Sequence, residues 1–237
     1  MSKYTGSTGV VASVPPVADD VTPQHELGTK VVTPDGRAYR YVGCGGTALV
    51  TGNLIQSEAE DTGEQNLAVD AAAIGATTVT TSTTVTVVAN EYAGGQMLVS
   101  VTPGLGTIYR IKRHPAATAA TVVLTLEDPI QVALTTDSRV DLVPNIYDNV
   151  IQSPATASGV TLGVAVNNIT ADQYGWIQVG GIANCLADGT VTVGTHVVKS
   201  DATAGAVEAF TGVLASVGTA VTGIASTESG AILLHIE

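Results

Sequence analysis

Turn sequences separate short alternating stretches along most of the chain, and this spacing constrains the fold more than any other feature. Pro34-Asp35-Gly36 divides two alternating stretches, and Asp188-Gly189 does the same near the C-terminal end. Turn residues of this kind favour tight β-hairpins. They recur about every ten residues, which is typical of antiparallel sandwiches and barrels rather than of parallel sheets with crossover helices.

The residues between the turns also favour strands. Hydrophobic residues make up 45% of the chain but aromatic residues only 4%, so a core must be built mainly from Val, Ala, Ile, Leu and Thr. β-branched residues favour strands over helices. We therefore predict an all-β protein, with short helical pieces expected only around Ala68–Ile74 and Thr170–Tyr174.

Composition divides the chain into three parts. It changes near Pro144-Asn145, and from residue 149 onward there are six acidic residues, one Lys and no Arg. We predict two β-sandwich or barrel-like domains, residues 27–148 and 149–237. Residues 1–26 contain Gly, Ser, Thr and three Pro with little periodicity. Such a segment buries too little apolar surface to offset about 1–2 kcal/mol per residue of ordering entropy, so we expect an extended arm that is flexible on its own.

The charge balance argues against a nucleic-acid partner. Nine basic and twenty-one acidic residues give a net charge of −12, which repels phosphate backbones. The one cationic cluster is Arg110-Ile-Lys112-Arg113-His114. It can be a contact for an acidic neighbouring chain or a solvated strand face.

No segment suggests a membrane partner. The uncharged stretches Ala71–Asn90 and Ala209–Thr227 are interrupted by Thr, Ser and Gly, and neither is apolar enough for a spanning helix. The first twenty residues lack the apolar core of a signal peptide, so we expect no export.

Catalytic motifs are weak. Asp61-Thr62-Gly63 matches an aspartic-protease signature, but its flanks are polar, which indicates a surface turn. Cys44 and Cys185 lie among small apolar residues and match no metal spacing, so we expect buried thiols. The alternative for Cys185 is that it acts as a nucleophile with His196 as its base. We predict no enzymatic activity, cofactor or metal.

The segment from Tyr174 to Gly194 reads YGWIQVGGIANCLADGTVTVG and holds the chain's only Trp. Gly180-Gly181 indicates a tight turn or bulge between strands Gly175–Val179 and Ala183–Leu186. Trp176 is expected either to anchor the core or to face another subunit.

This segment, followed by HVVKSDATAGAVEAF and AILLHIE, resembles small structural proteins of tailed bacteriophages, most closely capsid decoration (cement) proteins. The resemblance covers residues 27–237 and rests on strand and turn patterns, with no catalytic signature. It includes the upstream segments LGTKVVTPDGRAYRYVGCGGTALVTGNLIQS, EYAGGQMLVSV, GTIYRIKRHPAA and LTLEDPIQVALTTDSRVDLVPN.

The resemblance implies a structural protein, made in the host cytoplasm, that binds the outer surface of the capsid as a trimer and stabilises contacts between major capsid subunits. The arm is then expected to add a strand to a capsid subunit or a sister chain. The alternative is a head fibre or tail-associated protein whose C-terminal domain binds host glycans. The residues expected to contact the capsid or another subunit are Val10, Val11, Val14, Pro15, Pro16, Arg110, Lys112, Arg113 and Trp176.

Overall fold

The chain folds almost entirely into β-structure, so the predicted fold class is confirmed. The computed structural model describes residues 18–118, 120–212 and 215–237. Strands account for 43% and helix for 1%. The one helix named in the described ranges is the 3-10 turn η1 (Thr62–Glu64). The helical pieces expected at Ala68–Ile74 and Thr170–Tyr174 are wrong, because these ranges contain turns, isolated bridges and strand ends.

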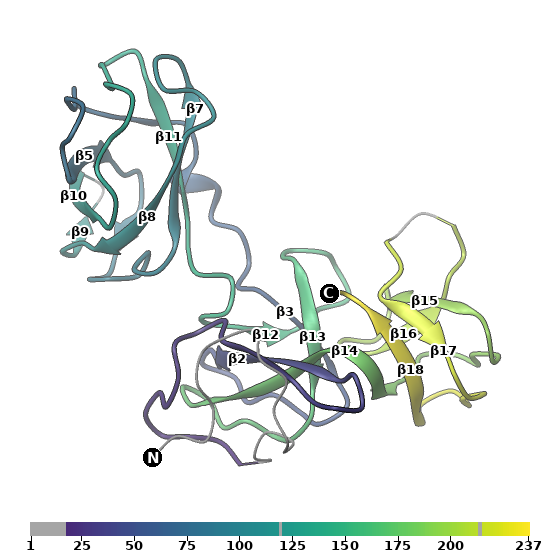
Figure 1. The fold of residues 1–237 in the computed structure, drawn as a ribbon. Coiled ribbons are helices and arrows are strands. Elements are labelled where there is room, and N and C mark those ends of the chain that lie inside the picture. Colours follow the sequence, from purple (N-terminus) through teal and green to yellow (C-terminus); the bar gives the residue numbers. More distant parts are fainter. Residues whose placement is uncertain (1–17, 119, 213–214) are drawn as a thin grey trace. The chain divides into compact units, whose positions relative to one another are not determined.

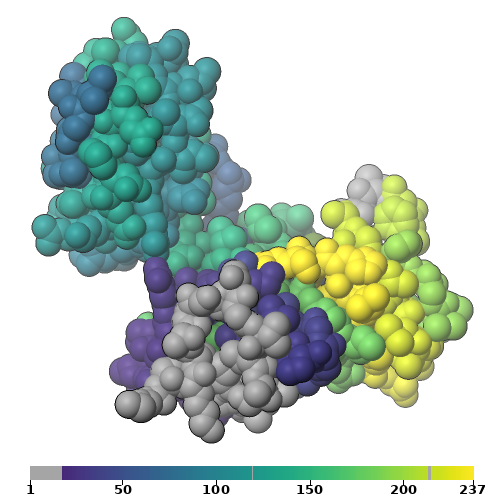
Figure 2. All heavy atoms as spheres, in the orientation of Figure 1, coloured from purple at the N-terminus to yellow at the C-terminus, as the bar shows by residue number. Residues whose placement is uncertain are grey.

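Two compact units make up the molecule, and one is inserted into the sequence of the other. Unit 2 is Glu60–Asn145, and unit 1 combines the residues before Glu60 with those from Ile146 onward. Unit 2 is coloured blue to green in Figures 1 and 2. The composition change near residue 145 marks one boundary of unit 2. The predicted division into 27–148 and 149–237 differs from these units, because strands before residue 60 pair with strands of the C-terminal half and leave no local signal in the sequence.

Unit 2 is a nearly closed, barrel-like sheet with the strand order β4-β11-β7-β8-β10-β5. Its two edge strands approach each other, because Val69 bridges Thr81 and the N–H of Asp70 donates to the carbonyl of Thr80. Closure of this kind leaves few free strand edges. The strands are β4 (Leu67–Ala68), β5 (Thr78–Ser82), β7 (Gln96–Val101), β8 (Ile108–Arg113), β10 (Thr121–Leu126) and β11 (Arg139–Val143), and β6 (Thr86–Val87) pairs separately with β9 (Ala117–Thr118).

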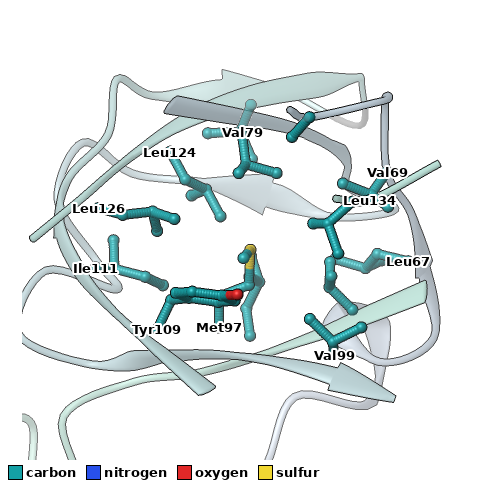
Figure 3. Packing of buried hydrophobic residues seen from close by; sticks show 14 of the residues in the cluster. Leu67, Val69, Val79, Met97, Val99, Tyr109, Ile111, Leu124, Leu126 and Leu134 are labelled. Carbon is teal, nitrogen blue, oxygen red and sulfur yellow. The ribbon is translucent and has the colours of Figure 1, made fainter. Parts of the chain in front are cut away.

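Strand alternation fills this barrel with apolar side chains. Along β10 the sequence TVVLTL buries Val122, Leu124 and Leu126 and exposes Thr121 and Val123. Figure 3 shows Leu124 and Leu126 pointing into the same interior as side chains from the other strands. Burying one such side chain stabilises the fold by about 1.5–3 kcal/mol.

Unit 1 is built on a ten-stranded sheet that curves into a half-barrel. The main strand order is β12-β3-β13-β14-β18-β17-β15-β16, and β2 pairs with both β1 and β14. The strands are β1 (Lys30–Val32), β2 (Ala38–Gly43), β3 (Leu54–Gln56), β12 (Ile151–Gln152), β13 (Thr161–Ala165), β14 (Tyr174–Leu186), β15 (His196–Lys199), β16 (Val207–Ala209), β17 (Gly218–Ala220) and β18 (Ser229–His235).

Strand β14 holds unit 1 together. It is one strand of 13 residues rather than the two that the glycine pair predicted, and its register shifts between Gln178 and Gly180. The first half pairs with β2 and β13, and the second half pairs with β18. Gly181 has φ +78° and lies so close to Arg37 that a Cβ would meet its Cα at 2.9 Å. The glycine pair therefore marks a bulge, not a reversal of the chain.

Several other strand predictions are confirmed. Alternation in the sequence predicts strands at Gln96–Val101, Thr121–Leu126 and Arg139–Val143, and the structure has strands at these bounds. The hairpin at Pro34-Asp35-Gly36 joins β1 to β2. The sequence after Asp188-Gly189 also predicts a strand at Thr190–Val193, and this prediction is wrong, since within that range only Val191 forms a bridge.

The described part of the predicted arm, residues 18–26, lies against unit 1. Asp20 and Tyr174 exchange two backbone hydrogen bonds of 2.8 and 2.9 Å, and the Tyr41 hydroxyl donates to the Asp20 carboxylate at 2.6 Å. His25 packs against the rings of Tyr41 and Trp176, and burial lowers the pKa of its imidazole. The expectation of a segment that is loose up to residue 26 is therefore wrong for these nine residues, because an aromatic cluster of their own unit binds them.

Candidate interaction surface

Strand β8 presents three cationic side chains on the surface of unit 2. Tyr109 and Ile111 point into the barrel core, whereas Arg110 and Lys112 are exposed, as strand alternation requires. Arg113 ends the strand and is exposed as well. We call Arg110, Lys112 and Arg113 the β8 cationic surface.

An apolar residue flanks this surface. Ile108 is 56% exposed and lies opposite Leu98 of β7. Ile108, Arg110 and Lys112 alternate along one strand, so the sequence TIYRIKR already contained the signal that our prediction missed. The surface therefore combines positive charge with an exposed aliphatic side chain.

Arg110 has an acidic neighbour within unit 2. Its guanidinium lies 3.6 Å from the Glu127 carboxylate, and the Glu127 N–H donates to the Arg110 carbonyl at 3.0 Å. Both side chains are more than 40% exposed, so this pair contributes at most about 1 kcal/mol. Glu127 offsets one of the three positive charges, and two remain.

Most other cations in the described ranges are engaged inside the chain. Lys30 and Arg40 form ion pairs with Glu237, and Arg37 pairs with Asp35. Lys199, which is 9% exposed, donates to the carbonyls of Pro154, Ala155 and Ser200. Arg139 donates to the carbonyls of Thr136 and Ser138.

Lys112 and Arg113 differ from these five cations and from Arg110. Within residues 18–118, 120–212 and 215–237, neither side chain forms an ion pair or hydrogen bond. They are adjacent and exposed, on a chain with a net charge of −12. Their charges are therefore available to a partner.

His114 belongs to the cationic cluster in sequence but not in space. It is buried, its Nε2 accepts the Tyr92 N–H at 2.9 Å, and its Nδ1 lies 2.9 Å from the Pro115 carbonyl. These contacts fit a neutral ring that donates from Nδ1. His114 anchors the end of β8 and is not part of the surface.

The other predicted contact residues are either buried or outside the described residues. Trp176 is 1% exposed in a core cluster with Val31, Tyr39 and Tyr41, which matches the core-anchor alternative and leaves its side chain out of reach of another subunit. The arm residues Val10, Val11, Val14, Pro15 and Pro16 lie outside the described residues.

The weak catalytic motifs have structural roles. The Asp61 carboxylate accepts the Gly63 N–H at 2.8 Å and caps η1, as expected for a surface turn. Cys44 and Cys185 are buried, free thiols, and burial raises the pKa of Cys185 to about 12. Cys185 lies in a core cluster while His196 lies on an exposed face, so the two do not meet as nucleophile and base.

No metal-ligand cluster or membrane-spanning helix accompanies the β8 cationic surface in the described residues. Among the described residues, no three His, Cys, Asp or Glu side chains are grouped so as to hold a metal ion. None of the helices in the described ranges has the length and hydropathy that a membrane span requires. Comparison with known protein families, with curated proteins and with solved structures finds no match.

Proposed function

We propose that this chain is a structural virion protein that binds the outer surface of a phage capsid and stabilises contacts between major capsid subunits. One observation carries the proposal: Lys112 and Arg113 are adjacent, exposed and unengaged within the described residues of an acidic chain. Two such charges, on a strand that also exposes Ile108 at its other end, suit an acidic protein surface that also offers an apolar contact.

The fold supports a role in binding surfaces rather than in chemistry. Both units are β-structures with apolar cores; of the residues in the weak catalytic motifs, Asp61 caps a turn and Cys44 and Cys185 lie buried. The sequence resemblance to decoration proteins adds the expectation of a homotrimer and of the major capsid protein as partner. Many copies on one head would add weak single contacts into stable attachment.

An acidic protein partner, opposite in charge to the β8 cationic surface, is favoured over nucleic acid. Unit 2 contains nine acidic and four basic residues, so its net charge is 4 − 9 = −5. A phosphate backbone would meet repulsion from the rest of the unit. A capsid surface with a local acidic patch would meet only the cations that face it.

Binding to purified heads that lack the protein tests the proposal. K112Q/R113Q should weaken binding by about tenfold or more, and raised salt should weaken wild-type binding in the same direction. The matched control is Q131E/A133E, which changes two exposed positions of the same unit and lowers the net charge by the same two units. Equal loss in both variants, or no loss in K112Q/R113Q, would overturn the role of this surface.

Bound copy number distinguishes the alternative. Quantitative mass spectrometry of virions should give hundreds of copies per particle for a decoration protein, on the order expected for a repeated lattice position. A few dozen copies or fewer would instead support a head fibre or tail-associated protein.

A further inference from the structure

Strand β14 of unit 1 has a short stretch that pairs with a neighbouring strand on one side only. At one end of this stretch Gly180 lies opposite Ala38 of β2, and at the other end the Leu186 N–H donates to the Gly52 carbonyl at 2.9 Å. Between these two points β14 pairs with β18 alone. We call residues 182–184 the β14 gap.

The peptide groups of Ile182 and Asn184 point into this gap. The Leu186 N–H points away from β18, and peptide groups alternate in direction along a strand, so those of Asn184 and Ile182 point the same way. The Ile182 carbonyl accepts a hydrogen bond from Gln178 Nε2. In the described part of the chain, the N–H groups of Ile182 and Asn184 and the Asn184 carbonyl have no hydrogen-bond partner. The gap therefore offers two donors and one acceptor.

A hollow lies along the gap. It has a volume of about 370 Å³, and all three gap residues line it, together with Arg37 and Thr51. Ligand pockets in proteins have volumes of about 300–1,000 Å³. The unpaired backbone groups therefore face a space that is large enough for an occupant.

A buried amide adds an acceptor to the hollow. Gln178 lines the hollow and is 4% exposed. Its Nε2 donates to the carbonyls of Gly180 and Ile182 at 3.0 and 2.9 Å, and these two bonds fix the amide group. Its Oε1 accepts no hydrogen bond from the described residues. Leaving a buried acceptor without a partner is costly, so Oε1 favours an occupant that donates a hydrogen bond.

Arg37 adds donors to the same hollow. Its Nε donates to the Asp35 carboxylate at 2.7 Å, and its side chain is 33% exposed. Its Nη1 and Nη2 donate to no group in residues 18–118, 120–212 or 215–237. They can donate to an oxygen of an occupant. Because Asp35 offsets the charge of Arg37, we expect recognition by hydrogen bonds rather than by net charge.

We propose that the hollow binds an extended peptide segment of a partner protein, which pairs with the β14 gap as a short antiparallel strand. One residue of the segment lies opposite Asn184 and exchanges both backbone hydrogen bonds with it. The residue two positions along presents its carbonyl to the Ile182 N–H. Gln178 Oε1 and the Arg37 Nη groups then bind further N–H and carbonyl groups of the segment. Addition of a strand to a free sheet edge is a recurrent mode of peptide recognition.

The spacing of the unpaired groups favours a peptide as the occupant. Ile182 and Asn184 are two residues apart, so their peptide groups repeat at about 7 Å along the strand. A second extended backbone has the same repeat of donors and acceptors, whereas a free carboxylate or a single sugar ring does not. The inference does not rest on capsid binding, and all the residues that carry it belong to unit 1.

Selection from a displayed library of random heptapeptides, with the full chain as the target, tests the proposal. Wild type should enrich peptides, and A231F should weaken their binding by about tenfold or more, because Ala231 lies opposite Asn184 and lines the hollow. The matched control is A209F, which adds the same ring to a partly buried alanine of β16 that does not line the hollow. It should bind within about twofold of wild type. Thermal unfolding of both variants checks that the fold is retained.

Amide hydrogen exchange tests the pairing itself. In the free chain the N–H groups of Ile182 and Asn184 should exchange faster than that of Ala183, which points toward β18. A bound peptide from the selection should slow exchange at Ile182 and Asn184 by about tenfold or more.

Three results would overturn the proposal. The first is that wild type enriches no peptide. The second is that A231F binds the enriched peptides as wild type does, or that A209F loses binding to the same extent as A231F. The third is that a bound peptide leaves exchange at Ile182 and Asn184 unchanged.

Discussion

Three basic residues of unit 1 and two of unit 2 are used in opposite ways. In unit 1, Lys30 and Arg40 hold Glu237, and Lys199 holds three backbone carbonyls. In unit 2, Lys112 and Arg113 have no partner within the described residues. Lys30, Arg40 and Lys199 of unit 1 fasten segments that are distant in sequence, whereas Lys112 and Arg113 of unit 2 are exposed on β8. The comparison separates charges that stabilise the fold from charges that can recognise a partner.

Topology explains part of this difference. Unit 2 is one continuous segment that closes on itself. Unit 1 is made of two segments, and its sheet pairs β2 with β14 and β3 with β13 across the inserted unit. Bringing distant segments together has a loop-closure cost, which ion pairs at their ends help to offset. A contiguous barrel needs fewer such contacts.

The largest expected effects come from the two cores. W176A should lower the free energy of unfolding of unit 1 by about 3–5 kcal/mol, because Trp176 is fully buried among aromatic rings. L124A should lower that of unit 2 by about 2–5 kcal/mol for the same reason.

Hydrogen exchange resolved by segment measures both effects. W176A should accelerate exchange in unit 1 and leave residues 60–145 protected, and L124A should do the reverse. Loss of protection in both units from either variant would break the comparison, since it would mean that the two units unfold together.

Acid should loosen the Glu237 contacts in unit 1. Burial opposes ionisation of Glu237, but hydrogen bonds and ion pairs from Arg40 and Lys30 lower its pKa from 4.5 to about 2. A lowered pKa contributes stability that is present above 4.5 and lost as the pH falls toward 2. E237Q should therefore destabilise unit 1 at pH 7 and flatten its pH dependence in this window. An unchanged acid transition in thermal unfolding of E237Q would contradict this account.

The stability that Glu64 contributes to unit 2 should depend on pH in the direction opposite to that of Glu237. It is 1% exposed, its Oε1 accepts from Thr83, and its Oε2 has no partner within the described residues. Burial raises the pKa of this carboxyl above 4.5. Its contribution is therefore present below 4.5 and is lost as the pH rises through the folded pKa. E64Q should remove this loss of stability at higher pH. Thermal unfolding measured from about pH 4 to pH 7 should then show a stability of unit 2 that changes less with pH than in wild type.

A smaller effect is expected where residues 18–26 lie against unit 1. Y41F removes the hydroxyl that donates to Asp20 and accepts from the Gln24 N–H, and should weaken attachment of this segment by about 0.5–1.5 kcal/mol. Faster hydrogen exchange confined to residues 18–26 would be the expected signature. Unchanged exchange there would show that the aromatic packing of His25 is sufficient.

Local patterns in the sequence predicted much of the fold. Alternation and turns located β7, β10 and β11 within unit 2, and the same alternation placed Arg110 and Lys112 on an exposed face. Exposure of Ile108 follows from the same pattern, but our prediction missed it. The role of β14 as one continuous strand did not, because its glycine pair is compatible with either a turn or a bulge.

Long-range pairing could not be predicted in this way. No local signal indicates that β2 joins β14, so the inserted position of unit 2 was missed. The exposed face shared by Phe210, Thr219 and Ile182 was missed for the same reason, since only cross-strand register brings these residues to one face of the sheet. Engagement of Lys30 and Arg40 by Glu237 likewise depends on folding.

The central claim is that the β8 cationic surface recognises a partner and does not stabilise the fold. The most direct measurement combines head binding with unfolding for K112Q/R113Q. The account predicts an affinity for purified heads reduced by about tenfold or more, with a free energy of unfolding within about 0.5 kcal/mol of wild type. Full binding, or a loss of binding matched by a comparable loss of stability, would contradict it.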